Sequence, residues 1–222
     1  MRQLISKRKR QRATSIKGHL VTYSNPDSVV SDEFRAIRTN INFLTEERRN
    51  RTFIITSPEI GEGKSTITAN LAVSMAQQKE RILLIDANLR GPVIHDIFKI
   101  PNEVGLTDIL SGKVHMESAV QKASIRHLEV LTSGAITANP AEILGNVYMN
   151  DLLTSVAATY DVVLIDSPPV LTSTETRVLA NQCDGVIIVL KRGKTELEKT
   201  TEASRVLKLA RAKLVGSIMN EK

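Results

Sequence analysis

Residues 56–65 read TSPEIGEGKS and come directly after an apolar run at 53–55. The run predicts a strand, the glycines predict a tight turn, and the Lys-Ser pair predicts the start of a helix. Gly61 and Gly63 allow backbone N–H groups to turn toward an anion. The helix that begins near Lys64 adds the positive end of its dipole. The stretch therefore predicts a cradle for phosphate groups.

The side chains of this cradle favour a nucleotide together with a metal ion. Lys64 supplies a point charge for the β- and γ-phosphates, and the Ser65 hydroxyl suits a Mg²⁺ ligand. The general motif has glycine where this chain has Pro58, but the GEGKST core is intact. We therefore interpret the stretch as a P-loop rather than a chance glycine-rich turn. The residues assigned to the nucleotide here are Ile60, Gly61, Glu62, Gly63, Lys64, Ser65 and Thr66.

Length and composition fit one large domain. The chain has 222 residues, and 41% of them are hydrophobic, which is enough for a sizeable core. No apolar run approaches the roughly 18 residues of a membrane span, and we expect no signal peptide because no apolar stretch follows the first basic residues. The single cysteine, Cys183, excludes an internal disulfide and fits a reducing cytoplasm.

Positive charge is concentrated at the start of the sequence. Residues 1–18 hold seven Lys or Arg and no acid, which leaves −1 for the rest of a chain whose net charge is +6. We predict a basic, flexible leader over 1–27 and a P-loop domain over 28–222. Such a leader is a solvated arm, a segment that binds anionic lipid headgroups, or a nucleic-acid contact. Aromatic residues are only 3% of the chain, which argues against base stacking and a specific nucleic-acid partner.

Strand-like and helix-like segments alternate along the chain. The strand-like segments are continuous Val, Ile and Leu runs, which is typical of a parallel sheet buried on both faces. We predict a doubly wound α/β fold with a mostly parallel sheet and helices on both faces. The predicted strands are 52–57, 81–86, 127–132, 161–166, 185–191 and 213–219. The predicted helices are 30–46, 64–78, 92–98, 105–111, 116–122, 140–158, 174–182 and 195–210.

Two aspartates end apolar runs in the same manner. Asp86 follows ILLI and Asp166 follows VVLI. The carboxyl ends of parallel strands meet at one edge of the sheet, so both carboxylates should lie beside the P-loop. Taken alone, each aspartate would be interpreted as a helix cap or a turn residue. Together with Lys64 and Ser65 they predict a Mg²⁺-phosphate site, because phosphoryl transfer needs a held metal and positioned oxygens.

The ordered motifs resemble those of the bacterial tyrosine kinases (BY-kinases) of capsule and exopolysaccharide operons, within the MinD/ParA-like P-loop class. GEGKST matches the Walker A motif of that family, ILLIDANLR matches its Walker A′ motif, and VVLIDSPP matches its Walker B motif. The resemblance covers about 23–220 and implies a P-loop fold. It also implies an ATP-dependent protein tyrosine kinase that regulates capsule or exopolysaccharide production.

The resemblance further implies roles for particular residues. Lys64 holds phosphates, Asp86 acts as the base toward the tyrosine hydroxyl, and Asp166 holds Mg²⁺ through its water shell. The catalytic set is thus Lys64, Asp86 and Asp166, and the metal set is Ser65, Asp86 and Asp166. Arg90 reaches phosphate or lies on the surface. Asn220 ends the last predicted strand. It either recognises the adenine base or is only a turn residue at the end of the strand.

The resemblance also implies partners and a location. We expect ATP and Mg²⁺ as cofactors and protein tyrosines as substrates. We expect activation by the cytoplasmic tail of a membrane adaptor, which places the chain at the inner face of the plasma membrane. Self-association into a ring and a counteracting tyrosine phosphatase are expected as well.

The oligomerisation motif of the family, Glu-x-x-Arg-x-x-Arg, occurs here as Asp32, Arg35 and Arg38. A spacing of three predicts that these residues share one face of the first long helix. They either form an ordinary set of helix ion pairs, worth about 0.2–0.5 kcal/mol per pair, or bridge neighbouring subunits. The family match favours the interface.

Several positions depart from the family. Asn88 replaces the second acid of Walker A′, and Glu175-Thr176 replaces an Asp-Ala pair after Walker B. The family usually ends in a tyrosine cluster, whereas this sequence ends at Lys222; the chain was shortened or its targets lie on other proteins. Its tyrosines are Tyr23, expected to be accessible, and Tyr148 and Tyr160, expected to pack. The basic residues at 191–194 are expected to lie on a solvated face.

Two other functions compete with the kinase. A MinD/ParA-type ATPase switch would hydrolyse ATP without touching tyrosine, but that class carries a lysine where this chain has Glu59. A weakly active nucleotide-binding regulator would explain Asn88, because an amide balances the charge of Mg²⁺ less well than a carboxylate.

Overall fold

The structure, a computed structural model, describes residues 20–44, 51–135 and 137–221. Within these ranges a seven-stranded sheet has the order β3-β4-β2-β5-β1-β6-β7. All neighbouring strands are parallel except β3, which is antiparallel to β4. The strands are β1 Arg51–Thr56, β2 Ile82–Asp86, β3 Gln121–Lys122, β4 Leu128–Leu131, β5 Val162–Asp166, β6 Gly185–Lys191 and β7 Leu214–Asn220. The predicted doubly wound α/β fold is confirmed.

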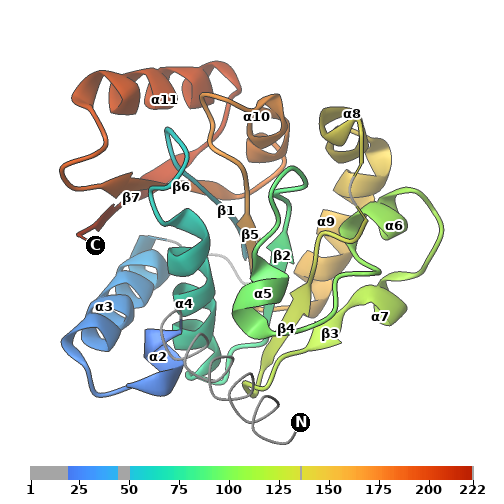
Figure 1. The fold of residues 1–222 in the computed structure, drawn as a ribbon, viewed down its shortest axis with the longest axis horizontal. Helices are drawn as coiled ribbons and strands as arrows, with labels where there is room; N and C mark the ends of the chain where they lie inside the picture. The colour runs from blue at the N-terminus through green and yellow to red at the C-terminus, as the bar shows by residue number, and fades with distance from the viewer. Residues whose placement is uncertain (1–19, 45–50, 136, 222) are drawn as a thin grey trace, which may run out of the picture.

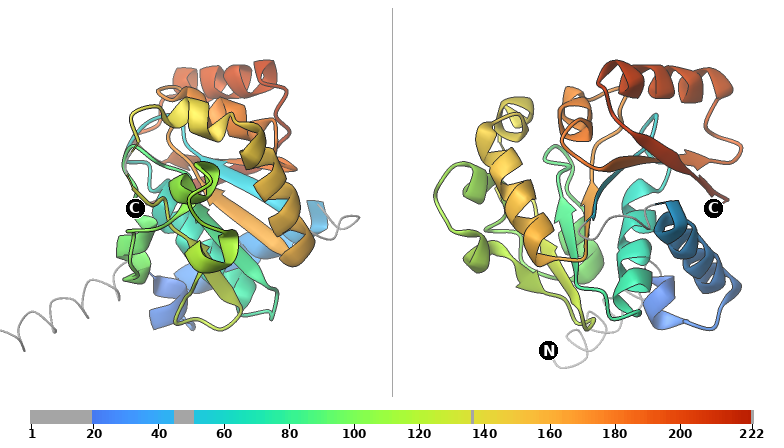
Figure 2. Two further views of the ribbon diagram at one scale, coloured as in Figure 1. Left: turned by 90° about the vertical axis from the view of Figure 1, so that its right-hand side faces the viewer. Right: turned by 180° about the vertical axis from the view of Figure 1, so that it is seen from behind.

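Helices cover both faces of the sheet (Figure 1). One face packs against α2 Val21–Ser24, α3 Val29–Leu44, α4 Lys64–Ala76 and α5 Ile94–Phe98. The other carries α6 Leu106–Leu110, α7 Met116–Ala119, α8 Pro140–Leu144, α9 Val147–Thr159, α10 Thr174–Ala180 and α11 Leu197–Leu209. Seen from behind in Figure 2, α3 and α4 lie on one side of the sheet and α9 and α11 on the other.

Strand β1 shows why the middle of a buried strand is apolar. Phe53 and Ile55 point into the core on the α4 side, and Ile54 between them points into the core on the other side. All three side chains are fully buried. A strand buried on both faces needs an unbroken apolar run because successive side chains alternate between the faces.

The prediction of one continuous helix over 140–158 is wrong. It is two helices, α8 and α9, with a break at Gly145 and Asn146. Gly145 ends α8, and Asn146 has φ −72° and ψ 152°, which is extended backbone before the first turn of α9. The two-residue strand β3 was also missed, inside the predicted helix 116–122.

The predicted boundary of the flexible leader at residue 27 is wrong for the part of the leader that the structure describes. Residues 21–24 form α2, and Leu20 and Thr22 are buried. The backbone N–H and the side chain of Thr22 donate to Asn70 Oδ1 at 3.1 Å and 2.9 Å. These bonds join α2 to α4 and make residues 20–27 part of the domain. Residues 1–19 of the predicted leader lie outside the described residues.

Within the described ranges, no helix combines the length and the apolar character that crossing a membrane requires.

Candidate phosphoryl-transfer site

The predicted P-loop connects the carboxyl end of β1 to the first residue of α4. Gly61 has φ +78° and Gly63 has φ +88°, a left-handed conformation that strains any residue with a Cβ atom. Gly63 is the N-cap of α4, so the positive end of that helix faces the turn. A Cβ atom at Gly63 would also collide with the side-chain amide of Asn220. Both glycines are thus required by the backbone of the loop.

Asp86 and Asp166 lie where the sequence places them, at the ends of neighbouring strands. They are paired in register across β2 and β5, and both are fully buried. Asp166 Oδ2 accepts a hydrogen bond of 2.6 Å from the Ser65 hydroxyl, at the start of α4. The structure therefore brings Ser65, Asp86 and Asp166 together at one edge of the sheet.

Backbone N–H groups orient Asp86. Its Oδ1 accepts from the N–H of Asn88 at 3.1 Å, and its Oδ2 accepts from Val93 and Ile94 at 3.1 Å and 3.0 Å. Burial and, to a smaller extent, the nearby charge of Asp166 raise the pKa of Asp86 to about 7, although these N–H groups lower it. A carboxyl group with a pKa near 7 exchanges protons at physiological pH, as a general base must.

Burial likewise raises the pKa of Asp166 to about 6, against the opposing effects of Lys64, Ser65 and Thr68. Its second oxygen, Oδ1, is buried and has no hydrogen-bond partner among the described residues. A buried carboxylate oxygen without a partner is unfavourable unless a cation or water binds it. Hard oxygen donors such as these suit Mg²⁺, so Ser65, Asp86 and Asp166 fit the metal that the sequence predicts.

The middle of the P-loop is held by residues from far along the chain. Glu62 is 1% exposed, and its backbone O accepts from Asn220 Nδ2 at 2.9 Å. Lys194 Nζ donates to the backbone O of Ile60 at 2.6 Å. Lys194 is exposed, as predicted for 191–194, but its ammonium group also contacts the P-loop. Sequence reasoning missed this contact because no local pattern links residues 134 positions apart.

Arg90 lies near the same edge but contacts protein. Its Nε donates to Glu175 Oε1 at 2.7 Å, and the side chains of Arg90 and Glu175 are 62% and 1% exposed. Glu175 Oε2 is buried without a partner within the described ranges. Glu175 thus fixes the direction of the Arg90 guanidinium, most of which stays accessible.

Comparison with known proteins agrees with this geometry. A family model described as an AAA domain matches residues 50–217. The tyrosine-protein kinase YwqD of Bacillus subtilis (strain 168) is 44% identical over 214 residues, which cover 96% of this chain and 90% of that protein. The chain belongs to the bacterial tyrosine-protein kinase family. The resemblance read from the motifs is confirmed.

Solved structures support the same assignment. The kinase domain of Escherichia coli tyrosine kinase ETK matches with a TM-score of 0.88 and 29% identity, covering 90% of this chain and 79% of that chain. The septum site-determining protein MinD of Pyrococcus horikoshii OT3, solved with Mg-ADP, matches with a TM-score of 0.66 and 25% identity, covering 77% and 70%. The tyrosine kinase family and MinD thus share this P-loop architecture.

The predicted oligomerisation residues do not share one exposed face. Asp32 and Arg35 form an exposed ion pair, with side chains 66% and 37% exposed. Arg38 is 7% exposed, and its Nη1 donates to the backbone O of Ser74 and to Ser74 Oγ. The expected shared face is wrong for Arg38, because a helix turns by about 100° per residue and a spacing of three drifts around its surface. The role of the three residues at a subunit interface stays a prediction.

The exposure of the three tyrosines agrees with the prediction for two of them and not for the third. Tyr23 is 50% exposed, as expected of an accessible residue, and Tyr160 is buried. Tyr148 was expected to pack but is 58% exposed, because it lies in the first turn of α9 on the side away from the core.

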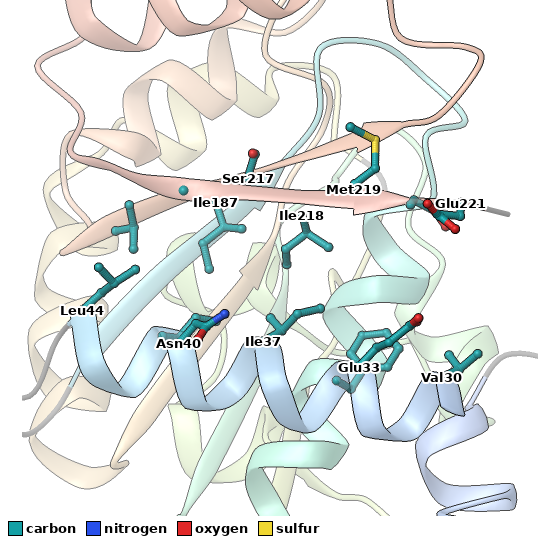
Figure 3. A pocket seen from close by; sticks show the side chains of 15 residues that line it. Val30, Glu33, Ile37, Asn40, Leu44, Ile187, Ser217, Ile218, Met219 and Glu221 are labelled. Atoms are coloured by element: carbon teal, nitrogen blue, oxygen red, sulfur yellow. The ribbon is translucent and has the colours of Figure 1, made fainter. Parts of the chain in front are cut away.

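An apolar groove of about 640 Å³ lies between α3 and the edge strand β7 (Figure 3). Ile37 and Leu44 of α3 face Ile187 and Ile218 of the sheet across it. Its lining also includes Asn220, whose amide holds the P-loop. The groove is therefore next to the phosphate cradle but separate from the edge that carries Asp86 and Asp166.

Proposed function

We propose that this tyrosine kinase homologue transfers the γ-phosphoryl group of ATP to protein tyrosine, with Mg²⁺ as cofactor. The observation that carries the proposal is the pairing of Asp86 with Asp166 in register, with Ser65 bonded to Asp166 beside the P-loop. Phosphoryl transfer requires little covalent chemistry from the protein beyond positioning and compensation of charge. The residues at this edge supply both.

The P-loop is the proposed binding site for the phosphates of ATP. The backbone N–H groups of 60–66 would bind the β- and γ-phosphates, and Lys64 would add a positive charge. Arg90 presents its accessible guanidinium to the same edge. Asn220, whose side-chain amide lies beside Gly63, is proposed to contact the adenine base.

Ser65, Asp86 and Asp166 would hold Mg²⁺. The metal supplies charge neutralisation on the β- and γ-phosphate oxygens. Ser65 would bind it directly through its hydroxyl, Asp166 would hold it through its water shell, and Asp86 would complete the set of acidic residues at the metal. The buried, unpartnered Asp166 Oδ1 supports this assignment.

Asp86 is proposed as the base. The tyrosine hydroxyl oxygen bonds to the γ-phosphorus, the bond from that phosphorus to the β,γ-bridging oxygen breaks, and ADP leaves. The hydroxyl proton passes to Asp86. A free tyrosine has a pKa of about 10, so a base assists the attack at pH 7.

The proposed cellular role rests on similarity to the tyrosine kinase relatives and not on contacts within this structure. We propose a function in capsule or exopolysaccharide production and recruitment to the inner face of the plasma membrane by the cytoplasmic tail of a membrane adaptor. A homo-oligomeric ring through Asp32 and Arg35, and a counteracting tyrosine phosphatase, belong to the same proposal. No specific nucleic-acid partner is proposed.

The competing function is an ATPase switch, which the structural similarity to MinD favours. The test is to incubate the purified chain with Mg-ATP and a tyrosine-containing copolymer, and to measure phosphotyrosine and inorganic phosphate in the same samples. A kinase produces phosphotyrosine in excess of free phosphate. Release of phosphate without phosphotyrosine, also in the presence of an adaptor tail, would support the switch instead.

A further inference from the structure

The outer side of the P-loop contacts the turn between β6 and α11. Three chain segments meet there, the P-loop, this turn at 191–196 and the end of β7. The contacts centre on Glu62, which is the buried acid of the loop. Glu62 Oε2 accepts from the N–H of Glu59 at 2.8 Å, and its Oε1 accepts from the hydroxyl of Thr195. Glu62 therefore faces the β6–α11 turn.

The hydroxyl of Thr195 is fixed in direction. Its oxygen accepts the backbone N–H of Lys191 at 2.7 Å, and the backbone N–H of Thr195 donates to the O of Lys191 at 2.9 Å. Since a hydroxyl has one proton and Lys191 occupies an acceptor position, that proton is available for Glu62. A hydrogen bond to a charged acceptor is stronger than one between neutral groups.

The turn that carries Thr195 is itself anchored to β7. Lys191 pairs with Asn220 across the sheet, and the N–H of Arg192 donates to the O of Asn220 at 2.9 Å. The side chain of Asn220 bonds the backbone O of Glu62 at 2.9 Å. Glu62 is thus held at its backbone by Asn220 and at its carboxylate by Thr195.

A second contact from the same turn holds the residue before the loop glycines. Lys194 Nζ donates to the O of Ile60 at 2.6 Å and would lie only 2.8 Å from a Cβ atom added to Gly61. The exposed ion pair of Lys199 with Glu59, at 3.3 Å, adds little because water screens it.

We propose that Thr195 is a positioning residue for nucleotide binding, acting on the P-loop through Glu62. The inference rests on the proposed function, since it takes the P-loop as the binding site of ATP. Without the Thr195 hydroxyl, the Glu62 carboxylate loses a partner and the loop must be ordered when the phosphates bind. Ordering a loop on binding weakens affinity. Thr195 does not contact the reacting atoms.

The test compares Thr195→Val, which removes the hydroxyl, with Thr195→Ser, which keeps it. Thr201→Val on α11 is the matched control, because the Thr201 hydroxyl is exposed and bonds only the O of Leu197 at 2.9 Å. The dissociation constant of Mg-ATP is measured with a fluorescent analogue, beside KM and kcat for ATP and the melting temperature without nucleotide.

Thr195→Val should bind about tenfold more weakly, as expected for a lost hydrogen bond to a charged group. It should raise KM for ATP by a similar factor and change kcat by less than about threefold. Thr195→Ser and Thr201→Val should match the wild type. The inference would be overturned if Thr195→Val bound Mg-ATP as tightly as the wild type. It would also be overturned if Thr195→Ser lost as much affinity for Mg-ATP as Thr195→Val.

The proposed function and this inference fail in different ways. A wild-type chain that bound no Mg-ATP would refute the use of the P-loop as the nucleotide site, and with it the inference. A wild-type chain that bound Mg-ATP without forming phosphotyrosine would refute only the kinase activity, and the comparison of Thr195→Val with Thr195→Ser would still decide the role of Thr195.

Discussion

Asp86 and Asp166 end neighbouring parallel strands directly opposite each other, and neither side chain reaches solvent. Two buried carboxyl groups this close repel when both are ionised, which raises the pKa of Asp86 beyond the effect of burial. Such a pair is unfavourable for the fold at neutral pH unless a cation or a proton is shared there. The pair therefore points to phosphate chemistry with a metal rather than to a structural role.

The first prediction concerns pH and stability. The pKa values of about 7 for Asp86 and about 6 for Asp166 lie above the ordinary 3.8. Proton binding thus stabilises the fold fully below about pH 4, and this contribution is lost as pH rises through 6 and 7. Without Mg²⁺, Asp86→Asn should be more stable than the wild type by on the order of 4 kcal/mol at pH 8 and by only about 1.5 kcal/mol at pH 5.

Calorimetry in EDTA at both pH values measures this difference. Added Mg²⁺ should raise the melting temperature of the wild type at pH 8 more than that of Asp86→Asn. A stability difference between the two proteins that is the same at pH 5 and pH 8 would contradict the assignment of the raised pKa to Asp86.

A second prediction tests whether residues 20–27 belong to the folded domain. Thr22→Val removes the hydroxyl that donates to Asn70 inside the core, and should lower the free energy of unfolding by about 1–2 kcal/mol. The control is Thr39→Val, because the Thr39 hydroxyl is exposed and bonds only the O of Arg35. Urea denaturation compares the two. Equal effects would show that α2 adds nothing to stability.

A third prediction separates Arg35 from Arg38. Arg38 is buried against Ser74, so Arg38→Ala should lower the free energy of unfolding by about 1.5–3 kcal/mol. Arg35→Ala removes an exposed ion pair and should change stability by less than about 1 kcal/mol. If Asp32 and Arg35 bridge subunits, Arg35→Ala should nevertheless reduce the assembled mass.

Light scattering and thermal melting on the same samples check this division. A variant at Arg35 that keeps the assembly intact while melting much earlier than the wild type would exclude the interface role.

A fourth prediction concerns Asn88. Its Nδ2 donates to the O of Gly91 at 2.8 Å, which an aspartate cannot do, so Asn88→Asp loses a bond within the loop. It gains a carboxylate near the proposed Mg²⁺ site, as in the Walker A′ motif of the family. We expect the rate of phosphotransfer to rise by about tenfold, roughly 1.4 kcal/mol of transition-state stabilisation. An unchanged rate at saturating Mg²⁺ would remove the reason to regard the site as weakened.

The sequence predicted those elements of the fold that depend on patterns among neighbouring residues. Each buried strand is an apolar run, and the glycines and Lys64 define the P-loop within ten residues. Asp86 and Asp166 could be placed together because parallel strands end at one edge. Those elements appear in the structure within two residues of their predicted bounds.

The errors share a different cause. α2 forms because Thr22 meets Asn70, which lies 48 positions later, and Arg38 turns inward because Ser74 accepts its bonds. The bond from Thr195 to Glu62 joins residues 133 positions apart. Such contacts exist only after the chain has folded, so neither periodicity nor a motif predicts them.

The account depends most on the P-loop lysine. The measurement is mass-spectrometric detection of phosphotyrosine formed from Mg-ATP by the wild type, by Lys64→Met and by Lys208→Met, an exposed lysine on α11 that serves as the control. If Lys64 binds the phosphates, phosphotyrosine should form with the wild type and Lys208→Met and should fall by at least about a hundredfold with Lys64→Met. Equal phosphotyrosine from Lys64→Met would contradict this role of Lys64.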